Sequence, residues 1–174
     1  MYNGAWDLGL PKGFGVCHYP DGSSYEGEWD EGVPQGHGLK KLNDGTTYQG
    51  NWEHGRAKGF GQKKMPNGTL FEGQWDEATF VSGKCQFPDG QIYDGAWRDG
   101  KPEGLGVKTW TDGRKYDGEW FQGRPIGEGI KTYQDGSQKR GRWIDGVFEI
   151  IDIVPDNEKR DTSEQSKPID MNRF

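Results

Sequence analysis

The stretch YEGEWDEGVPQGHG, residues 25–38, decides how this chain folds. It places its largest side chains beside glycines and contains almost no aliphatic residues. Because strand residues alternate between faces, Tyr25, Gly27 and Trp29 fall on one face and the two glutamates between them on the other. We expect a turn at residues 30–32 and a second strand that starts at the glycine pair of GHG. The stretch therefore predicts a β-hairpin.

The same pattern recurs in steps of 23 residues, with one step of 22. The motif aromatic-x-Gly-x-Trp begins at Tyr2, Tyr25, Tyr48, Phe71, Tyr93 and Tyr116, and a last, altered copy begins at Lys139. Asp-Gly or Asn-Gly dipeptides, a strong turn signal, separate the units. Seven tandem hairpins predict an all-β fold, an elongated single-layer antiparallel sheet.

The glycine inside each aromatic strand leaves room for a ring to pack over the backbone, so a core can form without a second sheet. We expect this core to be a one-dimensional stack shared between neighbouring units. Its members in the second to sixth units are Tyr25, Trp29, Tyr48, Trp52, Phe71, Trp75, Tyr93, Trp97, Tyr116 and Trp120, together with Gly27, Gly50, Gly73, Gly95 and Gly118.

Composition limits the function classes. Only 30% of the 174 residues are apolar and the mean hydropathy is -1.05, yet eight Trp, seven Tyr and eight Phe are too many aromatic residues for a disordered chain. A net charge of -6 without a basic run argues against nucleic acid as a partner. Because no apolar run approaches the ~20 residues that span a bilayer and the N-terminus does not resemble a signal peptide, we expect a cytoplasmic protein without a transmembrane segment.

The residues that carry chemistry do not form a site in the sequence. His18, His37 and His54 occupy three different repeat positions, and the carboxylates repeat with the scaffold, whereas a catalytic pair is a singular arrangement. The G-x-G pairs do not extend to the phosphate-binding motif G-x-G-x-x-G. Cys17 and Cys85 lie three repeats apart, too far for a disulfide. We therefore expect two free thiols, no enzymatic activity, no metal and no cofactor.

The repeat resembles the MORN repeat, whose units follow the pattern Y-x-G-x-W, then G-x-x-x-G-x-G, then Asp-Gly. The resemblance extends from residue 2 to about residue 146, and we assign residues 1–146 to the array. It implies an elongated array of β-hairpins that serves as a scaffold in cytoskeletal, ciliary or membrane-associated assemblies. Lipid binding has been proposed for some members of the family.

Two units depart from the pattern. The fourth is one residue short and lacks the turn glycine and the first G-x-G glycine, which predicts a locally altered turn. Either Phe80 and Val81 are exposed there for a partner, or the loop is simply repacked. The seventh unit has Lys139 in place of the aromatic residue and no G-x-G pair, which is typical of a terminal capping unit.

One column of the repeat is basic. The position two residues after the G-x-G pair holds Lys40, Lys63, Lys108 and Lys131, at intervals of roughly 10 Å by strand spacing. We call these four residues the lysine ladder. They could meet lipid phosphates; the alternative that we favour is that they pair across strands with the Glu and Asp column and keep the sheet soluble.

The C-terminal residues differ from the array. Residues 147–154 are strongly apolar and strand-like, and we interpret them as a strand that either caps the last hairpin or adds to a partner's sheet. Residues 155–174 form a charged extended tail that completes the expected docking element. The candidate partner contacts in this region are Phe148, Ile150, Ile151, Ile153 and Phe174.

The sequence thus predicts a non-enzymatic structural protein that docks other proteins in a large cytoskeletal assembly. The family resemblance favours a cilium or flagellum, for example a radial-spoke-like complex of the axoneme. The alternative is a peripheral membrane tether that binds anionic lipid through the repeat array. The identity of the partner and the oligomeric state stay open.

Overall fold

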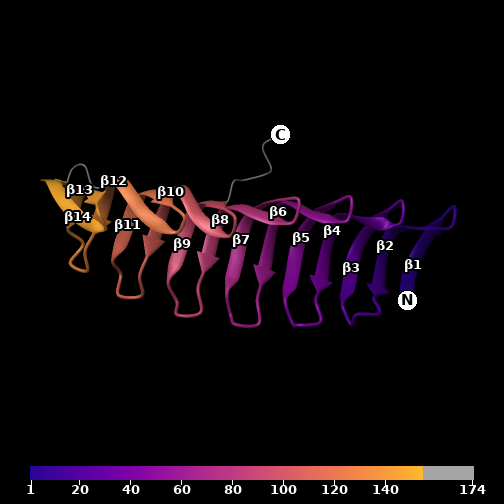
Figure 1. Cartoon of the computed structure of the whole chain (residues 1–174). Coiled ribbons are helices and arrows are strands. Elements are labelled where there is room, and N and C mark those ends of the chain that lie inside the picture. Colours follow the sequence, from indigo (N-terminus) through magenta and orange to yellow (C-terminus); the bar gives the residue numbers. More distant parts are fainter. Residues whose placement is uncertain (155–174) are drawn as a thin grey trace.

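The computed structural model describes residues 1–154, which form one antiparallel sheet of 14 strands (Figure 1). Each strand pairs with its neighbours in sequence, so the order across the sheet runs from β1 to β14. The strands are β1 (Tyr2–Asp7), β2 (Leu10–His18), β3 (Ser24–Asp30), β4 (Val33–Lys41), β5 (Thr47–Glu53), β6 (Arg56–Lys64), β7 (Leu70–Asp76), β8 (Thr79–Gln86), β9 (Ile92–Arg98), β10 (Lys101–Thr109), β11 (Lys115–Phe121), β12 (Arg124–Thr132), β13 (Gln138–Ile144) and β14 (Val147–Ile153). The expected fold class, an elongated single-layer array of hairpins, is confirmed.

Each hairpin closes with a two-residue turn in which both residues have positive φ. Glu31 and Gly32, for example, have φ angles of 46° and 83°. This is the conformation of a type I′ turn, whose twist matches that of the flanking strands. The fourth unit keeps this turn although it lacks the glycine, because Ala78 adopts a φ of 66°. The altered turn expected in that unit is therefore wrong.

The fourth unit is one residue shorter than the others because the bulge in its hairpin is smaller. In a regular unit Gly27 pairs with Gly38 and Trp29 with Pro34, so a single residue of β3 faces residues 35–37. The first glycine of the G-x-G pair lies in this bulge and has a positive φ, as at Gly36 (69°). The second strand of each hairpin thus starts directly after the turn and not at the G-x-G pair. Between β7 and β8 only Val81 is extra, so the bulge is smaller.

The loops between units are held by a side chain. In the first of them, the amide of Ser23 donates to Asp21 Oδ1 at 2.9 Å, and the amide of Tyr19 donates to the carbonyl of Ser23 at 2.9 Å. Hydrogen bonds from Ser23 lower the pKa of the Asp21 carboxyl. The same arrangement recurs in all six loops, and this explains why an Asp or Asn precedes each glycine.

A row of glycines crosses the sheet where the strands bend. The glycines that pair with one another in successive strands are Gly4, Gly15, Gly27, Gly38, Gly50, Gly61, Gly73, Gly83, Gly95, Gly106, Gly118, Gly129 and Gly141. Figure 1 shows each strand turning sharply between its loop end and its turn end. The row lies between the Tyr half and the Trp half of each hairpin, so the sheet is folded along its length into an open trough.

The tyrosine ring of each regular unit occupies the space that the glycine pair leaves. A Cβ atom added to Gly50 would lie 2.5 Å from the Cα of Gly61, 2.7 Å from the carbonyl oxygen of Phe60 and 2.9 Å from the Tyr48 hydroxyl. The Tyr48 hydroxyl also donates a hydrogen bond to the carbonyl of Asn51 at 3.2 Å. The fourth unit differs, because a Cβ atom on Gly73 would meet only backbone atoms and no ring.

The rings form a continuous ladder along the inside of the trough. Each tyrosine lies between the Trp of its own unit and the Trp of the next: Tyr25 contacts Trp29 and Trp52 edge-to-face, both with ring centroids 5.2 Å apart. The indole nitrogen of Trp52 then donates to the carbonyl of Gly38 in the preceding hairpin at 3.1 Å. Because each Trp joins two units, the core is shared between neighbours and needs no second layer.

Phenylalanines complete the ladder in the two atypical units. Phe80 is buried and contacts Phe71, Trp75 and Trp97, so the expectation that it is exposed for a partner is wrong. Val81, the bulge residue beside it, is partly exposed. In the seventh unit the ring of Phe148 covers Gly141, where Lys139 cannot supply an aromatic ring.

The sheet extends past the expected boundary at residue 146. β14 pairs with β13, with Trp143 opposite Phe148 and Gly141 opposite Ile150, so residues 147–153 are the second strand of the seventh hairpin and not a separate element. The interpretation of 147–154 as a docking strand outside the ribbon needs this correction. Ile150, Ile151 and Ile153 are exposed on the edge strand. Phe174 and the tail from residue 155 lie outside the described residues.

Replacing Gly50 with Ala should lower the unfolding midpoint, because the φ of Gly50 suits any residue but the methyl group has no space between Gly61 and Tyr48. Overpacking of this kind costs about 1–3 kcal/mol. Gln49→Ala, on the exposed face of the same strand, is the control and should change the midpoint little. Equal midpoints in urea denaturation followed by Trp fluorescence would contradict the packing argument.

Trp52→Ala should destabilise the array by about 3–5 kcal/mol, as for other buried aromatic residues. Trp52 is 9% exposed and joins two units, whereas Trp6 holds the same repeat position at the end of the sheet and is 58% exposed. Trp6→Ala is therefore the matched control. Thermal unfolding of both variants should show a much larger loss for Trp52; a loss of the same size for both would show that the ladder is not cooperative.

The array should lose stability at alkaline pH. Burial raises the pKa of Tyr48 and of Tyr116 to about 12, and it raises the pKa of Tyr25 and Tyr93 as well. Since the unfolded value is ~10, the contribution of these neutral phenols is fully present below pH ~10 and is lost as the pH rises toward 12. The absorbance of phenolate and the circular dichroism should therefore change together above pH 10. Ionisation of all tyrosines near pH 10 with the fold intact is the opposite result.

Candidate functional site

The two faces of the sheet carry different chemistry. The inner face holds the Tyr and Trp ladder, and the outer face holds the acidic residues such as Glu26 and Glu28, which are exposed. The lysine ladder lies on the inner face: Lys40 pairs across strands with Tyr25 on one side and Tyr48 on the other. The favoured expectation that these lysines pair with the Glu and Asp column is wrong, because the two columns face opposite sides of the sheet.

The lysine ladder contacts rings instead of carboxylates. The ammonium of Lys40 lies 4.4 Å from the centre of the Tyr19 ring, and that of Lys63 lies 5.9 Å from the Trp75 ring. Lys108 lies over Phe87 and Trp110, and Lys131 lies over Trp143 and Phe148. Within residues 1–154 none of the four forms an ion pair. The inner face therefore combines aromatic rings with positive charges that form no ion pair in the described array, although the loop carboxylates of Asp21 and Asp44 interact electrostatically with Lys40 and Lys63.

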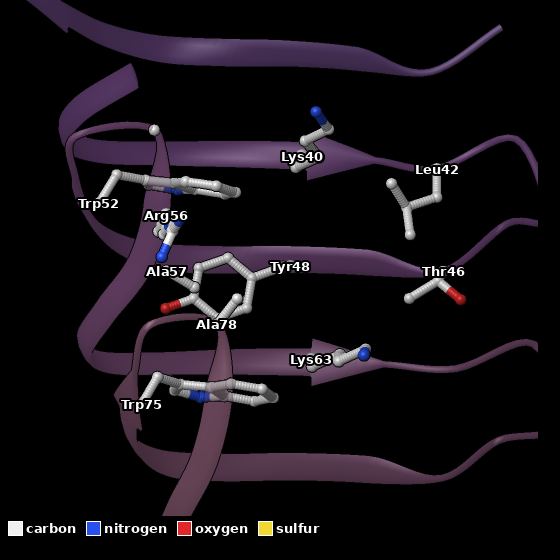
Figure 2. A pocket seen from close by; sticks show the side chains of 11 residues that line it. Lys40, Leu42, Thr46, Tyr48, Trp52, Arg56, Ala57, Lys63, Trp75 and Ala78 are labelled. Atoms are coloured by element: carbon white, nitrogen blue, oxygen red, sulfur yellow. The ribbon is translucent and has the colours of Figure 1, made fainter. Parts of the chain in front are cut away.

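A pocket opens on this face in the third unit (Figure 2). Trp52 and Trp75 project from the bent half of the sheet on either side of Tyr48, with Lys40 and Lys63 farther toward the loops. The cavity measures about 230 Å³. The residues that line it are Lys40, Leu42, Thr46, Tyr48, Trp52, Gly55, Arg56, Ala57, Lys63, Trp75 and Ala78.

Ala57 explains why the pocket lies in this unit. The residue that pairs with the unit's Trp is Pro11, Pro34, Ala57, Phe80, Pro102, Pro125 and Phe148 in successive units. Alanine is the smallest residue of this column, so the space that a proline or phenylalanine ring fills elsewhere is free beside Ala57, in the pocket of the third unit. The sequence contained this signal, since the proline column and its exception stand in register with the Trp residues. Our sequence reasoning did not use it.

The pocket carries positive charge and no acidic side chain. Of its three cationic residues, Arg56 forms an ion pair with Glu77 at the rim, whereas Lys40 and Lys63 have no such partner among the described residues. Apart from Thr46 and Gly55, the other residues of the lining are aromatic or aliphatic. The site is suited to hold an apolar group next to negative charge.

We also searched the described residues for metal sites, membrane-spanning helices and disulfides. Residues 1–154 contain no cluster of three or more His, Cys, Asp or Glu side chains placed to hold a metal ion, and no helix long and apolar enough to span a membrane. Cys17 and Cys85 are both free thiols. Cys85 is buried beneath the ladder, and burial raises its pKa to about 11.

The comparisons with known proteins concern the repeat and the fold. Among solved structures, the chain is similar to the TCP10 domain of Danio rerio CPAP, with a TM-score of 0.52 and 16% identity over 80% of this chain and 66% of that chain. It is also similar to the SAS-4 (dCPAP) TCP domain of Drosophila melanogaster, solved with a proline-rich motif of Ana2 (dSTIL), with a TM-score of 0.48 and 14% identity over 74% and 71% of the two chains. No curated protein sequence matches. The chain thus spans just under two thirds of the CPAP domain, with which it shares a fold.

The family model of the MORN repeat matches six consecutive segments, residues 2–24, 25–47, 48–70, 71–92, 93–113 and 116–138. The seventh hairpin, β13 and β14, continues the same sheet beyond the matched segments. Since the six segments cover most of the sequence and coincide with the hairpins, the chain belongs to the MORN repeat family.

Proposed function

We propose that this protein is a non-enzymatic scaffold that docks other proteins through the inner face of its array. The observation that carries this proposal is a row of half-buried lysines that lie over largely buried aromatic rings along one side of the trough. The array offers a long surface of one chemical kind, with a pocket in its third unit. Such a surface serves recognition, whereas catalysis needs a single arrangement of reactive groups.

The proposed setting is a cytoskeletal assembly in the cytoplasm, most specifically the axoneme of a cilium or flagellum. Its support is the membership of the MORN repeat family together with an elongated shape that suits a spacer or a docking platform. A radial-spoke-like complex is one assembly of this kind. The edge strand β14, with its exposed isoleucines, offers such an assembly a second contact surface.

Proximity labelling in ciliated cells tests this proposal. A biotin ligase fused to the full chain should label a reproducible group of cytoskeletal proteins, with axonemal proteins enriched over a control that expresses the ligase alone. Labelling that matches the free ligase would show that the chain does not belong to a cytoskeletal assembly.

A second candidate function is a peripheral membrane tether, and the lysine ladder favours it because four unpaired cations lie on one face. Two features oppose it: the net charge of -6, and the position of the ladder inside the bend of the sheet. We therefore expect that vesicles containing phosphatidylserine do not float the full chain at physiological salt. Flotation that salt abolishes, and that the Lys40→Glu, Lys63→Glu variant loses, would favour the tether instead.

A further inference from the structure

We propose that the pocket of the third unit is the anchor site for an extended, acidic segment of a partner protein, which inserts one apolar side chain into the space beside Ala57. This inference rests on the proposed scaffold function and deepens it, because it names the partner's chemistry and the unit that selects it. The proposed recognition has an apolar part, an electrostatic part and a geometric part.

The apolar part comes from the walls of the pocket. Trp52 and Trp75 stand on either side of Tyr48, and both Trp rings contact Tyr48 edge-to-face with centroids 5.1 and 5.2 Å away. Hydrogen bonds from the indole nitrogens to Gly38 and Gly61 fix the two Trp rings. The walls are thus rigid before a ligand arrives, and a side chain that enters meets ring faces and the methyl groups of Ala57 and Ala78.

The electrostatic part comes from the rim. Lys40 and Lys63 flank the pocket on its open side, and neither forms an ion pair with another residue of the array. The loop carboxylates of Asp21 and Asp44 interact electrostatically with Lys40 and Lys63 but form no ion pair with them, so both ammonium groups can bind a further anion. A segment that places carboxylates over them would neutralise both charges, whereas a basic segment would be repelled.

The geometric part concerns spacing. Lys40 and Lys63 occupy equivalent positions two strands apart, which corresponds to ~9.6 Å at ~4.8 Å per strand. An extended peptide in the polyproline II conformation advances ~3.1 Å per residue with three residues per turn, so side chains three positions apart lie ~9.3 Å apart on the same side. The ligand should therefore carry acidic residues three positions apart, with its apolar anchor between them, and should run along the trough across the strands.

Selection of peptides provides the test. A displayed library of random decapeptides is selected on the full-length chain, and in parallel on the Ala57→Pro variant. Proline is the residue of four other units at this position, so the substitution suits the hairpin while it fills the pocket. We expect the native chain to enrich sequences with one apolar residue between two acidic residues, and Ala57→Pro to bind the enriched peptides at least tenfold more weakly. Thermal unfolding should show that Ala57→Pro keeps the fold.

Charge reversal separates the two lysines of the pocket from the rest of the ladder. Lys40→Glu and Lys63→Glu should each weaken the binding of the enriched peptides by about tenfold, whereas Lys131→Glu, three units beyond the pocket, should change their affinity less than about twofold. Enriched peptides that lack acidic residues, or that bind Ala57→Pro equally well, would overturn the proposal, as would a selection that enriches nothing.

A photoreactive benzoylphenylalanine at Leu42, on the rim of the pocket, identifies the occupant. In the purified chain mixed with an enriched peptide, cross-links should form to the peptide. Cross-links to a second copy, or to residues 155–174 of the same chain, that the peptide does not displace would overturn the proposal. If Ala57→Pro retains every cellular neighbour of the native chain, the pocket assignment fails and the scaffold function stands; if the native chain itself has no neighbours, the scaffold function fails.

Discussion

The fold depends on one steric constraint: a tyrosine ring must lie over two paired glycines. Where Gly50 and Gly61 face each other, neither can carry a side chain, and the ring of Tyr48 takes the space. Repeated in unit after unit, this contact produces the row of glycines at which the strands bend. The bend in turn brings the Trp half of each hairpin over the Tyr half, so the rings on the inner face are buried although the sheet has a single layer. Hydrophobic burial therefore follows from the glycines as much as from the rings.

Much of this architecture could be predicted from the sequence because the same hairpin pattern recurs in seven units. The alternation in YEGEW predicts which face is buried, and the Asp-Gly and Asn-Gly dipeptides predict the loops between units. The start of the second strand could not be predicted in the same way. Its first residues are irregular in sequence, and the bulge around Gly36 depends on pairing with another strand, which no local pattern reveals.

The site was harder to predict than the fold. The lysine ladder was visible in the sequence, but it was assigned to the wrong face of the sheet. Side chains alternate between the two faces, and a bulge interrupts this alternation, so the face of a residue cannot be counted from the start of the strand. Of the two interpretations of Phe80, exposure for a partner was wrong: its role became clear only when the structure placed it opposite Trp75, where four other units have a proline. The pocket arises from the same position in the preceding unit. A repeat protein acquires a specific site where one unit departs from the others, so the exceptions in its columns identify function better than the shared residues do.

The fourth unit divides the mechanical continuity of the array. In the regular units, the indole of each Trp reaches back to a glycine carbonyl of the preceding hairpin, as Trp52 does to Gly38. The indole nitrogen of Trp97, which follows the shortened hairpin, is buried and finds no acceptor in the described part of the chain, and the same holds for Trp143 in the terminal hairpin. We call the junction between the fourth and fifth units the joint. Of the ring and indole contacts, only those of Phe71 and Phe80 with Trp97 couple the two units there. The stability of a repeat array depends on the interface energies between neighbouring units, so a weak interface divides the array into two cooperative blocks. A pulling force along the ribbon would therefore separate the two blocks at the joint before it unfolded either of them.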